Sequence, residues 1–294
     1  MPRIHALLAT AILATVAPSA SHAATDWKLV GQALGKSGTE MPGGVYRIGL
    51  PRTDLHVKRG NTELKATFAL GSWVAFREMG TSAEVMGDLV LTEDEIQPVM
   101  KSLLDSGLEI TALHNHLFHA VPPTFYMHVG GMGDPITLAK AIRTALALSK
   151  TPISMAASTP PPAIDLDTAA IDAALGAKGN NAAGVYQVTI PRAEPIKSMG
   201  AAVPIAMGVG QAINFQPLGE GEAAITGDFI LIAKEVNPVI RALRKNGIDV
   251  TALHNHMLDD EPRMFFVHFW AQDELGKLLT GLKAALSEIA LKKN

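Results

Sequence analysis

The chain has 294 residues, of which 25 are Lys or Arg and 28 are Asp or Glu, so its formal net charge at neutral pH is −3. This balance lacks the basic excess that binding to a nucleic-acid backbone requires, and it argues against that class of partner. The length suits two domains of ordinary size, and the absence of cysteine excludes disulfides and any lipid attached through a thiol.

Residues 1–23 have the pattern of a secretory signal peptide. Arg3 supplies the positive charge, residues 6–17 form the apolar segment, and the sequence Ser-His-Ala places small residues before the cut. The apolar segment is too short to span a bilayer. We therefore expect cleavage after Ala23, or after Ala24, and a periplasmic or secreted mature protein without an integral membrane segment. A retained amphipathic or anchor helix is the alternative.

A first domain is predicted over residues 26–150, where strand patterns and helix patterns both occur. Asp26 is placed as the N-cap of an opening helix that Gly35 ends. Thr92 and Glu95 form a capping box at the start of a second helix. The expected strands are residues 45–50, 65–76, 84–91, 109–117 and 124–129, with a loop at 119–123 and a closing helix at 135–148.

A second domain is predicted over residues 165–294, after a linker. Residues 151–164 are rich in Pro, Ala and Ser and include consecutive prolines, which neither a helix nor a central strand tolerates. Asp167 and Gly176 bound the first helix of the second domain. Further helices are expected at 235–245 and 273–290, and strands at 249–257 and 263–270. Antiparallel strands with helices on one face predict an α+β fold for each domain.

The second domain repeats the first. The hexapeptide Thr-Ala-Leu-His-Asn-His at residues 111–116 recurs at residues 251–256, which is 140 positions later. The same offset relates Pro51-Arg52 to Pro191-Arg192, Gly87-Asp88 to Gly227-Asp228 and His128 to His268. We therefore expect two tandem pseudo-symmetric domains, each an antiparallel sheet with helices packed on one face.

The histidines retained in both copies form the same pattern, a His-x-His pair followed by a third histidine. They are His114, His116 and His128 in the first copy and His254, His256 and His268 in the second. Residues two apart on a strand share a face, so each trio is expected to project from one face of a hairpin. The expected cross-strand pairs are His114 with His128, His116 with Tyr126, His254 with His268 and His256 with Phe266.

Each trio is expected to converge on one point within its own copy. Three neutral imidazoles with a fourth position open match a zinc site that accepts water or substrate, and imidazole also suits copper, iron and nickel. Leu113 and Leu253 lie on the opposite face, which is expected to pack under the helices. The histidine face is then free for a ligand or for the other copy. The alternative is that these histidines are hydrogen-bonded structural residues.

Other residues extend the candidate ligand face. Asp88 and Asp228 offer a carboxylate as metal ligand or base, although Gly-Asp before an apolar run is also typical of a bulge or turn. Arg52 and Arg192 could bind an anionic group or form ordinary salt bridges. An aromatic lining would come from Tyr126, Phe266 and Trp270.

Several motifs in order carry a family resemblance. They are Gly-Ser-Trp-Val-Ala-Phe at 71–76, Met-Gly-Asp-Leu-Val-Leu at 86–91, the hexapeptide at 111–116, and His128. With these, nearly all of the expected mature chain resembles the LppY/LpqO family of exported bacterial proteins of unknown function. The resemblance implies export and a tandem fold, and it implies no activity. The second copy departs from the pattern at 213–215, where Ile-Asn-Phe stands, and the cysteine of a lipoprotein anchor is absent.

Three functions follow from these observations. The first is an exported protein that binds zinc or another divalent transition metal, with hydrolysis by metal-bound water as its reaction. The second is a non-catalytic module that binds a small molecule or an envelope component and keeps its histidines for structure. The third is a structural protein in which the histidines join the two copies.

The export interpretation predicts the N-terminus of the protein recovered from its native compartment. We expect intact-mass measurement to show a chain that begins at Ala24 or Thr25, because the small residues before these positions suit signal peptidase. A mature chain that still begins at Met1 or Pro2 would contradict the periplasmic or secreted assignment.

Overall fold

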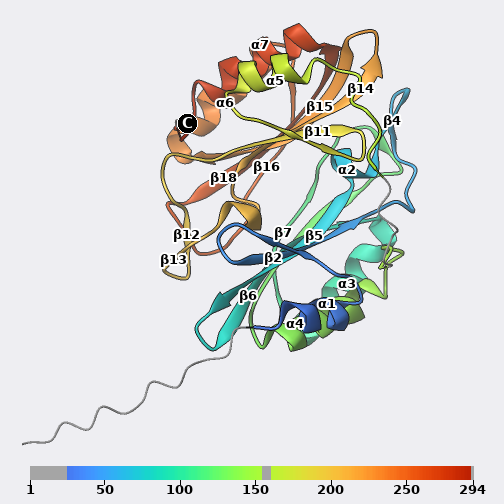
Figure 1. The fold of residues 1–294 in the computed structure, drawn as a ribbon, viewed down its shortest axis with the longest axis vertical. Coiled ribbons are helices and arrows are strands. Elements are labelled where there is room, and N and C mark those ends of the chain that lie inside the picture. The colour runs from blue at the N-terminus through green and yellow to red at the C-terminus, as the bar shows by residue number, and fades with distance from the viewer. Residues whose placement is uncertain (1–24, 154–159, 293–294) are drawn as a thin grey trace, which may run out of the picture.

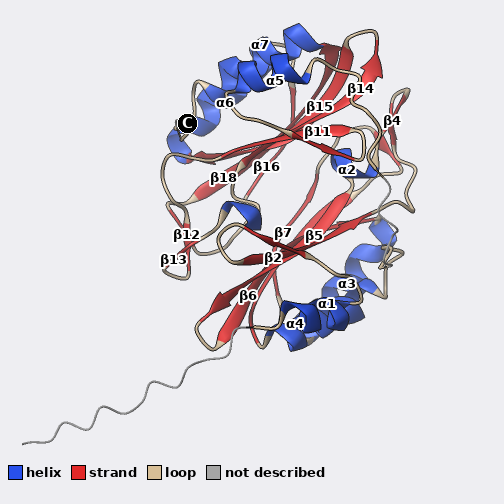
Figure 2. Ribbon diagram, viewed as in Figure 1, coloured by secondary structure: helices blue, strands red, loops and turns tan. Residues whose placement is uncertain are grey.

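The computed structural model describes residues 25–153 and 160–292. Its two halves lie against each other, and each is built on a six-stranded antiparallel sheet with helices on the outer side (Figure 1). The two sheets face each other across the middle of the molecule, as colouring by secondary structure shows (Figure 2). The expected signal peptide at 1–23 and residues 154–159 of the expected linker lie outside the described residues.

The first half contains four helices and nine strands. Its helices are α1 (Trp27–Leu34), α2 (Ala66–Ala69), α3 (Glu93–Asp105) and α4 (Pro135–Leu146). Its strands are β1 (Thr39–Met41), β2 (Val45–Pro51), β3 (Lys58–Arg59), β4 (Thr62–Glu63), β5 (Gly71–Met79), β6 (Ser82–Leu91), β7 (Glu109–Asn115), β8 (Ala120–Val121) and β9 (Phe125–Gly133). The large sheet has the order β1-β2-β5-β6-β9-β7.

The second half repeats this plan. Its helices are α5 (Thr168–Leu175), the 3-10 helix η1 (Ile205–Met207), α6 (Ala233–Lys245) and α7 (Leu275–Leu286). Its strands are β10 (Asn180–Ala182), β11 (Val185–Ile190), β12 (Lys197–Ser198), β13 (Ala201–Ala202), β14 (Gln211–Gly219), β15 (Glu222–Ile232), β16 (Asp249–His254), β17 (Asp260–Glu261) and β18 (Met264–Glu274). The sheet order β10-β11-β14-β15-β18-β16 matches the first half strand for strand. The expected α+β fold of two tandem pseudo-symmetric domains is confirmed.

The helix boundaries follow from capping residues. Asp26 accepts a hydrogen bond from a backbone N–H of α1 at 3.0 Å, and Asp167 does the same for α5 at 2.9 Å. Gly35 and Gly176 end these helices with φ angles of 92° and 68°, a region that glycine enters without a steric penalty. Glu95 closes the expected capping box of α3. A cap of this kind contributes about 1 kcal/mol.

The outer face of each sheet packs against the helices of its own half. Val74 and Phe76 of β5 and Leu103 of α3 are fully buried in the first half, as are Phe215 of β14 and Leu282 of α7 in the second. Burial of one such side chain contributes about 1.5–3 kcal/mol. Among the described residues, no helix is long and apolar enough to cross a membrane.

Each half also sends one segment onto the inner face of the other half. We call residues 52–70, between β2 and β5, and residues 191–210, between β11 and β14, the exchanged arms. In the first arm Phe68 packs against Trp270 of the second half, with ring centroids 5.8 Å apart. In the second arm Met207 is buried in a cluster that includes Trp73 of the first half. Figure 1 shows α2 of the first arm beside β11 and β14.

Polar contacts hold the exchanged arms in place. Lys65 Nζ donates to the carbonyl oxygen of Gly184 at 2.8 Å. Asn214 Nδ2 donates to the carbonyl oxygen of Phe68 at 3.0 Å, and Arg47 Nη1 donates to that of Ala206. Because each half makes both apolar and polar contacts with the other, the two halves form a single folded body.

Several element boundaries differ from the sequence expectation, and two of the differences have a clear cause. The pattern predicts one strand over 65–76, but residues Ala66–Ala69 form α2 and the strand begins at Gly71, because the arm must turn back from the second half to the first sheet. The helix expected at 273–290 begins at Leu275, since β18 stays paired with β15 as far as Glu274.

Leu113 and Leu253 do not pack under the helices as expected. They are 42% and 51% exposed. Both lie on strands at the edge of their sheets, β7 and β16, whereas the residues that do pack under the helices, such as Met127 and Val129, lie on the neighbouring strand β9.

Arg52 and Arg192 anchor the exchanged arms. Arg52 Nη1 donates to the carbonyl oxygen of Val90 and to Glu95, both at 2.7 Å, and Arg192 makes the same two contacts at equivalent positions. Both arginines are buried, and their guanidinium groups form these ion pairs, as the salt-bridge alternative predicts. Burial opposes ionisation of Glu95, but hydrogen bonds from Arg52 and two backbone N–H groups together hold its pKa below the usual value.

We predict that Arg52→Ala destabilises the protein by about 3–5 kcal/mol, because Glu95 becomes a buried charge without its partner. Urea denaturation at neutral pH measures this loss. The control is Lys101→Ala, which removes the exposed pair with Asp105 and should cost less than about 1 kcal/mol.

The same pair predicts a pH effect. The pKa of Glu95 is lower in the folded chain than in the unfolded chain, so its contribution is complete above the unfolded pKa of about 4.3 and is lost as the pH falls through the folded pKa. In Glu95→Gln the free energy of unfolding should therefore fall less steeply as the pH is lowered than in the wild type.

In the urea experiment, an equal loss of stability in Arg52→Ala and Lys101→Ala would contradict the structural role of Arg52.

Candidate metal centre

Four strands bring the retained histidines to the inner faces of the two sheets. β7 and β9 carry His114 and His128, and β16 and β18 carry His254 and His268. β6 and β15 each add an aspartate in register with the third histidine, the pairs being Asp88 with His128 and Asp228 with His268. Because cross-strand partners share a face, these side chains all point toward the other half.

The register of each hairpin differs from the expected one by two residues. His114 lies opposite Tyr126 and not His128, and His254 lies opposite Phe266. The strand ends early because the Asn115 side chain accepts a hydrogen bond from the backbone of Leu117 at 2.9 Å, which turns the chain after β7. A shift of two residues preserves the face, so the expected orientation of the histidines holds although their partners change.

The six histidines gather in one cluster between the halves. The ring centroids of His114 and His254 are 3.6 Å apart, those of His116 and His268 are 3.5 Å apart, and those of His128 and His256 are 3.9 Å apart. Each of these short distances joins one half to the other. The expectation of a separate trio in each copy is therefore corrected, because the inner faces oppose each other and bring both trios to the same place.

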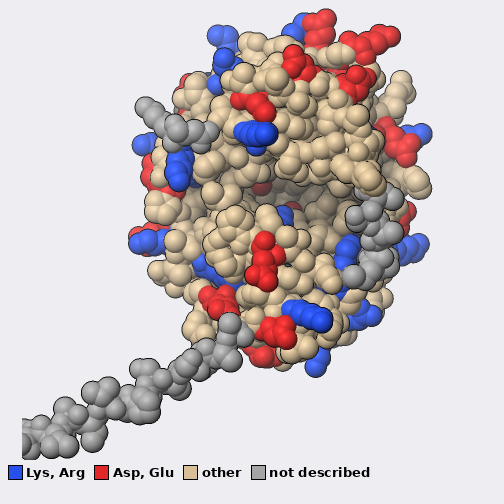
Figure 3. All heavy atoms as spheres, in the orientation of Figure 1, with Lys and Arg blue, Asp and Glu red and all other residues tan. Residues whose placement is uncertain are grey.

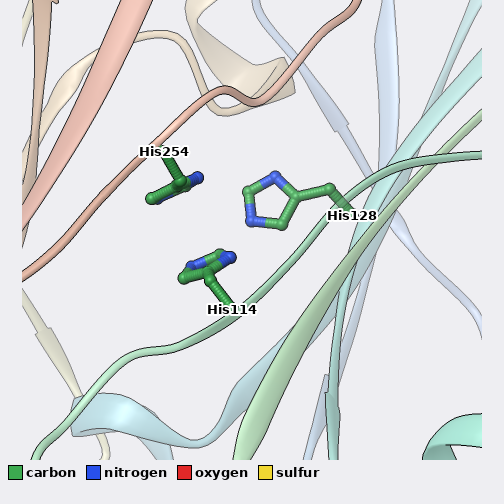
Figure 4. A group of neighbouring side chains, drawn as sticks. All are labelled: His114, His128 and His254. Carbon is green, nitrogen blue, oxygen red and sulfur yellow. The ribbon is translucent and has the colours of Figure 1, made fainter.

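Three groups of side chains have ligand atoms close enough to hold an ion. In each group the ligand atoms lie within 4.8 Å of one another, and the groups are His114 with His128 and His254, His114 with His116 and His268, and Asp228 with His254 and His268. Two of the groups combine both halves. Figure 4 shows the first of them, with the rings of His114 and His254 stacked and the ring of His128 beside them.

The cluster concentrates buried polar atoms that lack a hydrogen-bond partner. Fourteen such side-chain atoms occur among the described residues, and ten of them belong to this region. The ten lie on Asp88, His114, His116, Tyr126, His128, Asp228, His254 and His256. A buried polar group without a partner destabilises the fold by about 1–3 kcal/mol. A ligand that bonds to several of these atoms would therefore be stabilised at this place.

The imidazoles of the cluster are neutral at physiological pH. Burial, followed by the nearby histidines, lowers the pKa of His114 to about 2. Burial lowers the pKa of His254 to about 4 and that of His256 to about 3, and it holds the pKa of His128 and His268 well below the ordinary value. Neutral imidazole is the form that ligates metals.

Two backbone contacts select the ring nitrogen that stays free. His268 Nδ1 lies 3.0 Å from the carbonyl oxygen of Gly227, and His254 Nδ1 lies 2.7 Å from that of Asn255. A carbonyl oxygen only accepts, so a neutral ring must carry its proton on Nδ1. Each ring then presents the lone pair of Nε2, which for His268 faces His114 Nε2 at 3.2 Å. A backbone contact at Nδ1 is the arrangement that orients metal-binding histidines.

The two aspartates reach the edge of the cluster. Asp88 Oδ1 lies 3.6 Å from His128 Nε2, and Asp228 Oδ1 lies 3.9 Å from His268 Nδ1. Burial raises the pKa of Asp88 to about 8, although Arg47 opposes the shift, and burial together with Asp88 raises the pKa of Asp228 well above its ordinary value. A cation between the halves would lower both values.

The Gly-Asp sequence does not form the bulge or turn that its pattern allows. Gly87 and Asp88 lie within β6, paired in continuous register with β5 and β9. A Cβ atom on Gly87 would lie 2.8 Å from Val74 and 3.0 Å from Val129. The glycine therefore permits the close packing that seats the aspartate beside the histidines.

The aromatic residues expected on the ligand face divide into two groups. Tyr126 stacks on His116 with centroids 3.5 Å apart, and Phe266 lies 4.9 Å from the ring of His256. Trp270 instead packs against the first exchanged arm, with the Arg59 guanidinium 4.5 Å from its ring. Tyr126 and Phe266 thus border the cluster, whereas Trp270 belongs to the interface between the halves.

Sequence comparison of the copies missed Arg47 and Trp73. The guanidinium of Arg47 lies 3.9 Å from the Trp73 ring, which in turn lies 6.1 Å from the ring of His256. Neither residue recurs: Gln187 replaces Arg47, and in the sheet register Ala212 replaces Trp73. The difference between the copies at residues 213–215, where the second copy lacks the tryptophan segment of the first, is the sequence feature that could have indicated these two residues.

A cavity of about 1080 Å³ reaches the cluster from the surface. Its walls include His116, Tyr126 and His268 together with Trp73 and residues of both exchanged arms. Figure 3 shows the surface hollowed between the two halves. A small molecule could therefore approach the histidines through this groove.

Comparison with known proteins identifies a family and little else. A family model described as Domain of Unknown Function (DUF1259) matches residues 28–148 and again residues 169–288. This match supports two tandem copies and does not carry the LppY/LpqO name. No curated protein matches the chain.

Three solved structures resemble the chain weakly. The trimeric bacterial microcompartment shell protein PduB is 13% identical, with 88% of this chain and 96% of that chain covered and a TM-score of 0.23. EtuB from Clostridium kluyveri is 10% identical, with coverages of 85% and 91% and a TM-score of 0.20. An unknown protein from Galdieria sulphuraria is 10% identical, with coverages of 72% and 94% and a TM-score of 0.18. Scores this low carry no argument about fold or function.

Proposed function

The chain belongs to the family described as Domain of Unknown Function (DUF1259), and we propose that this member binds a divalent transition metal ion between its two copies. The observation that carries the proposal is the set of ten buried polar atoms without partners, gathered where six imidazoles meet. A tetrahedral metal ion accepts four lone pairs at once, whereas one water molecule donates to only two.

The competing structural interpretation requires that each histidine have a hydrogen-bond partner. His128 has neither nitrogen bonded, and neither has His116, although both rings are at least partly buried. If the histidines served only to join the two copies, these buried nitrogens would remain without hydrogen-bond partners. Neutral, desolvated rings whose ligand atoms lie within 4.8 Å of one another instead fit metal ligands.

The donor set favours zinc or another divalent transition metal. Imidazole nitrogens with an adjacent carboxylate suit zinc and also copper, iron and nickel, whereas the hard cations calcium and magnesium prefer oxygen ligands. The groove beside His116 and His268 provides access for a small molecule. Bound water on the metal would then supply a nucleophile near neutral pH, which makes hydrolysis the proposed reaction.

The proposed place of action is the periplasm or the exterior of the cell. This part of the proposal rests on the signal-peptide pattern of residues 1–23 alone. The proposed ligand is a small molecule or a component of the envelope, because the groove lies between the two halves and is lined by both exchanged arms.

We predict that the mature protein, purified from its native compartment, contains bound divalent metal by elemental analysis. His114→Ala combined with His128→Ala should remove it, since these two residues take part in the three-histidine groups. A chelator should lower the melting temperature of the wild type, because metal at 100 times its dissociation constant adds about 2.7 kcal/mol of stability.

The matched control is His56→Ala, whose side chain is 82% exposed and lies outside the cluster. This variant should retain the metal and the response to chelator. Wild-type protein that contains no metal, takes up none on dialysis against zinc and melts identically with and without chelator would refute the proposal.

A further inference from the structure

The cluster offers more donors than one ion can use. Six imidazoles and two carboxylates lie on the inner faces, whereas a tetrahedral ion takes four ligands. The donors also divide between two ends. One end is marked by the pair Asp88 and His128, and the other by the pair Asp228 and His268, each held in register on adjacent strands.

Each end is completed by the opposite half. His116 of the first half lies 3.5 Å from His268, measured between ring centroids, and its symmetry counterpart His256 lies 3.9 Å from His128. His114 and His254 stack in the middle at 3.6 Å. His254 has ligand atoms near His128 of the first end and near His268 of the second, and His114 likewise reaches both ends. Because His114 Nε2 lies 3.2 Å from His268 Nε2, we assign His114 to the second end, which leaves His254 for the first.

The two ends differ in what covers them. Trp73 pairs with Asp88 across the strands, whereas Ala212 occupies the same position beside Asp228. The indole of Trp73, with Arg47 stacked on it, lies beside His256, with ring centroids 6.1 Å apart. The small side chain of Ala212 leaves the other end open, and three of its donors, His116, His268 and Asp228, line the groove. Of the first end only the carboxylate of Asp88 lines the groove, and none of its histidines does.

We infer that the centre holds two divalent ions of different accessibility. An enclosed ion is held by His128 and His254, whose ligand atoms lie within 4.8 Å of each other, with His256 and Asp88 beside them. A groove ion is held by His114, His116 and His268, with Asp228 beside them. The groove ion is the one that accepts an oxygen atom of the incoming small molecule, because closed sites are structural and open sites bind substrate. The inference rests on the proposed function and deepens it.

The number of ions tests the inference. The mature full-length chain is dialysed against zinc, freed of excess metal and analysed for zinc per chain. We expect two ions in the wild type, one in His268→Ala and one in His128→Ala, with His56→Ala as the control that keeps both. If a histidine-to-alanine variant fails to fold, the corresponding glutamine variant replaces it.

The outcomes separate the two proposals. One ion in the wild type, or the loss of both ions in each single variant, overturns the two-ion inference and leaves metal binding intact. No ion in the wild type overturns both. Two ions that survive in His268→Ala would overturn the assignment of the groove ion.

Release kinetics test the unequal access. Mixing the zinc-loaded wild type with a chromogenic chelator should give a fast phase from the groove ion and a slow phase from the enclosed ion. Ala212→Trp should slow the fast phase by an order of magnitude or more and leave the slow phase unchanged, and Trp73→Ala should accelerate the slow phase. Ala212→Leu serves if the tryptophan variant does not fold.

Ala147→Trp is the control for an added indole, because Ala147 is exposed at the end of α4, away from the groove. It should leave both phases as in the wild type. A single release phase in the wild type, or phases that neither Ala212→Trp nor Trp73→Ala alters, overturns the inference of an enclosed and an open ion.

Discussion

Burial of the two inner sheet faces against each other governs the rest of this structure. The exchanged arms make that burial possible, because Phe68 and Met207 cover the apolar parts of the opposing faces around the polar centre. Burial between the sheets lowers the pKa of the imidazoles and so keeps them neutral. The chemistry of the centre is thus a consequence of how the halves pack.

Local features of this fold could be read from the sequence. The caps at Asp26 and Asp167 and the capping box at Glu95 depend only on nearby residues, and the structure has them where the pattern predicts. The inward face of His114 and His128 follows from the period of two along a strand, and it survives a register error of two residues because that error is even. Patterns within one element therefore predicted orientation well.

Relations between elements could not be read in the same way. A strand pattern does not encode what lies opposite the strand, so nothing in the spacing of His114, His116 and His128 shows that His254 stacks on His114. Comparison of the two copies identifies residues that both retain, and it does not identify residues that only one copy has. Arg47 and Trp73 were missed for that reason, although they are what makes one end of the cluster differ from the other.

The exchanged arms have the geometry of a domain swap between two like subunits. Two separate copies joined by such arms would form an isologous dimer, and every residue of one would be matched in its partner. Joining the copies in one chain replaces a concentration-dependent association with an intramolecular one. It also lifts the requirement of symmetry, so a tryptophan can stand on one side of the axis and an alanine on the other, a division of labour that a homodimer encoded by one short chain cannot reach.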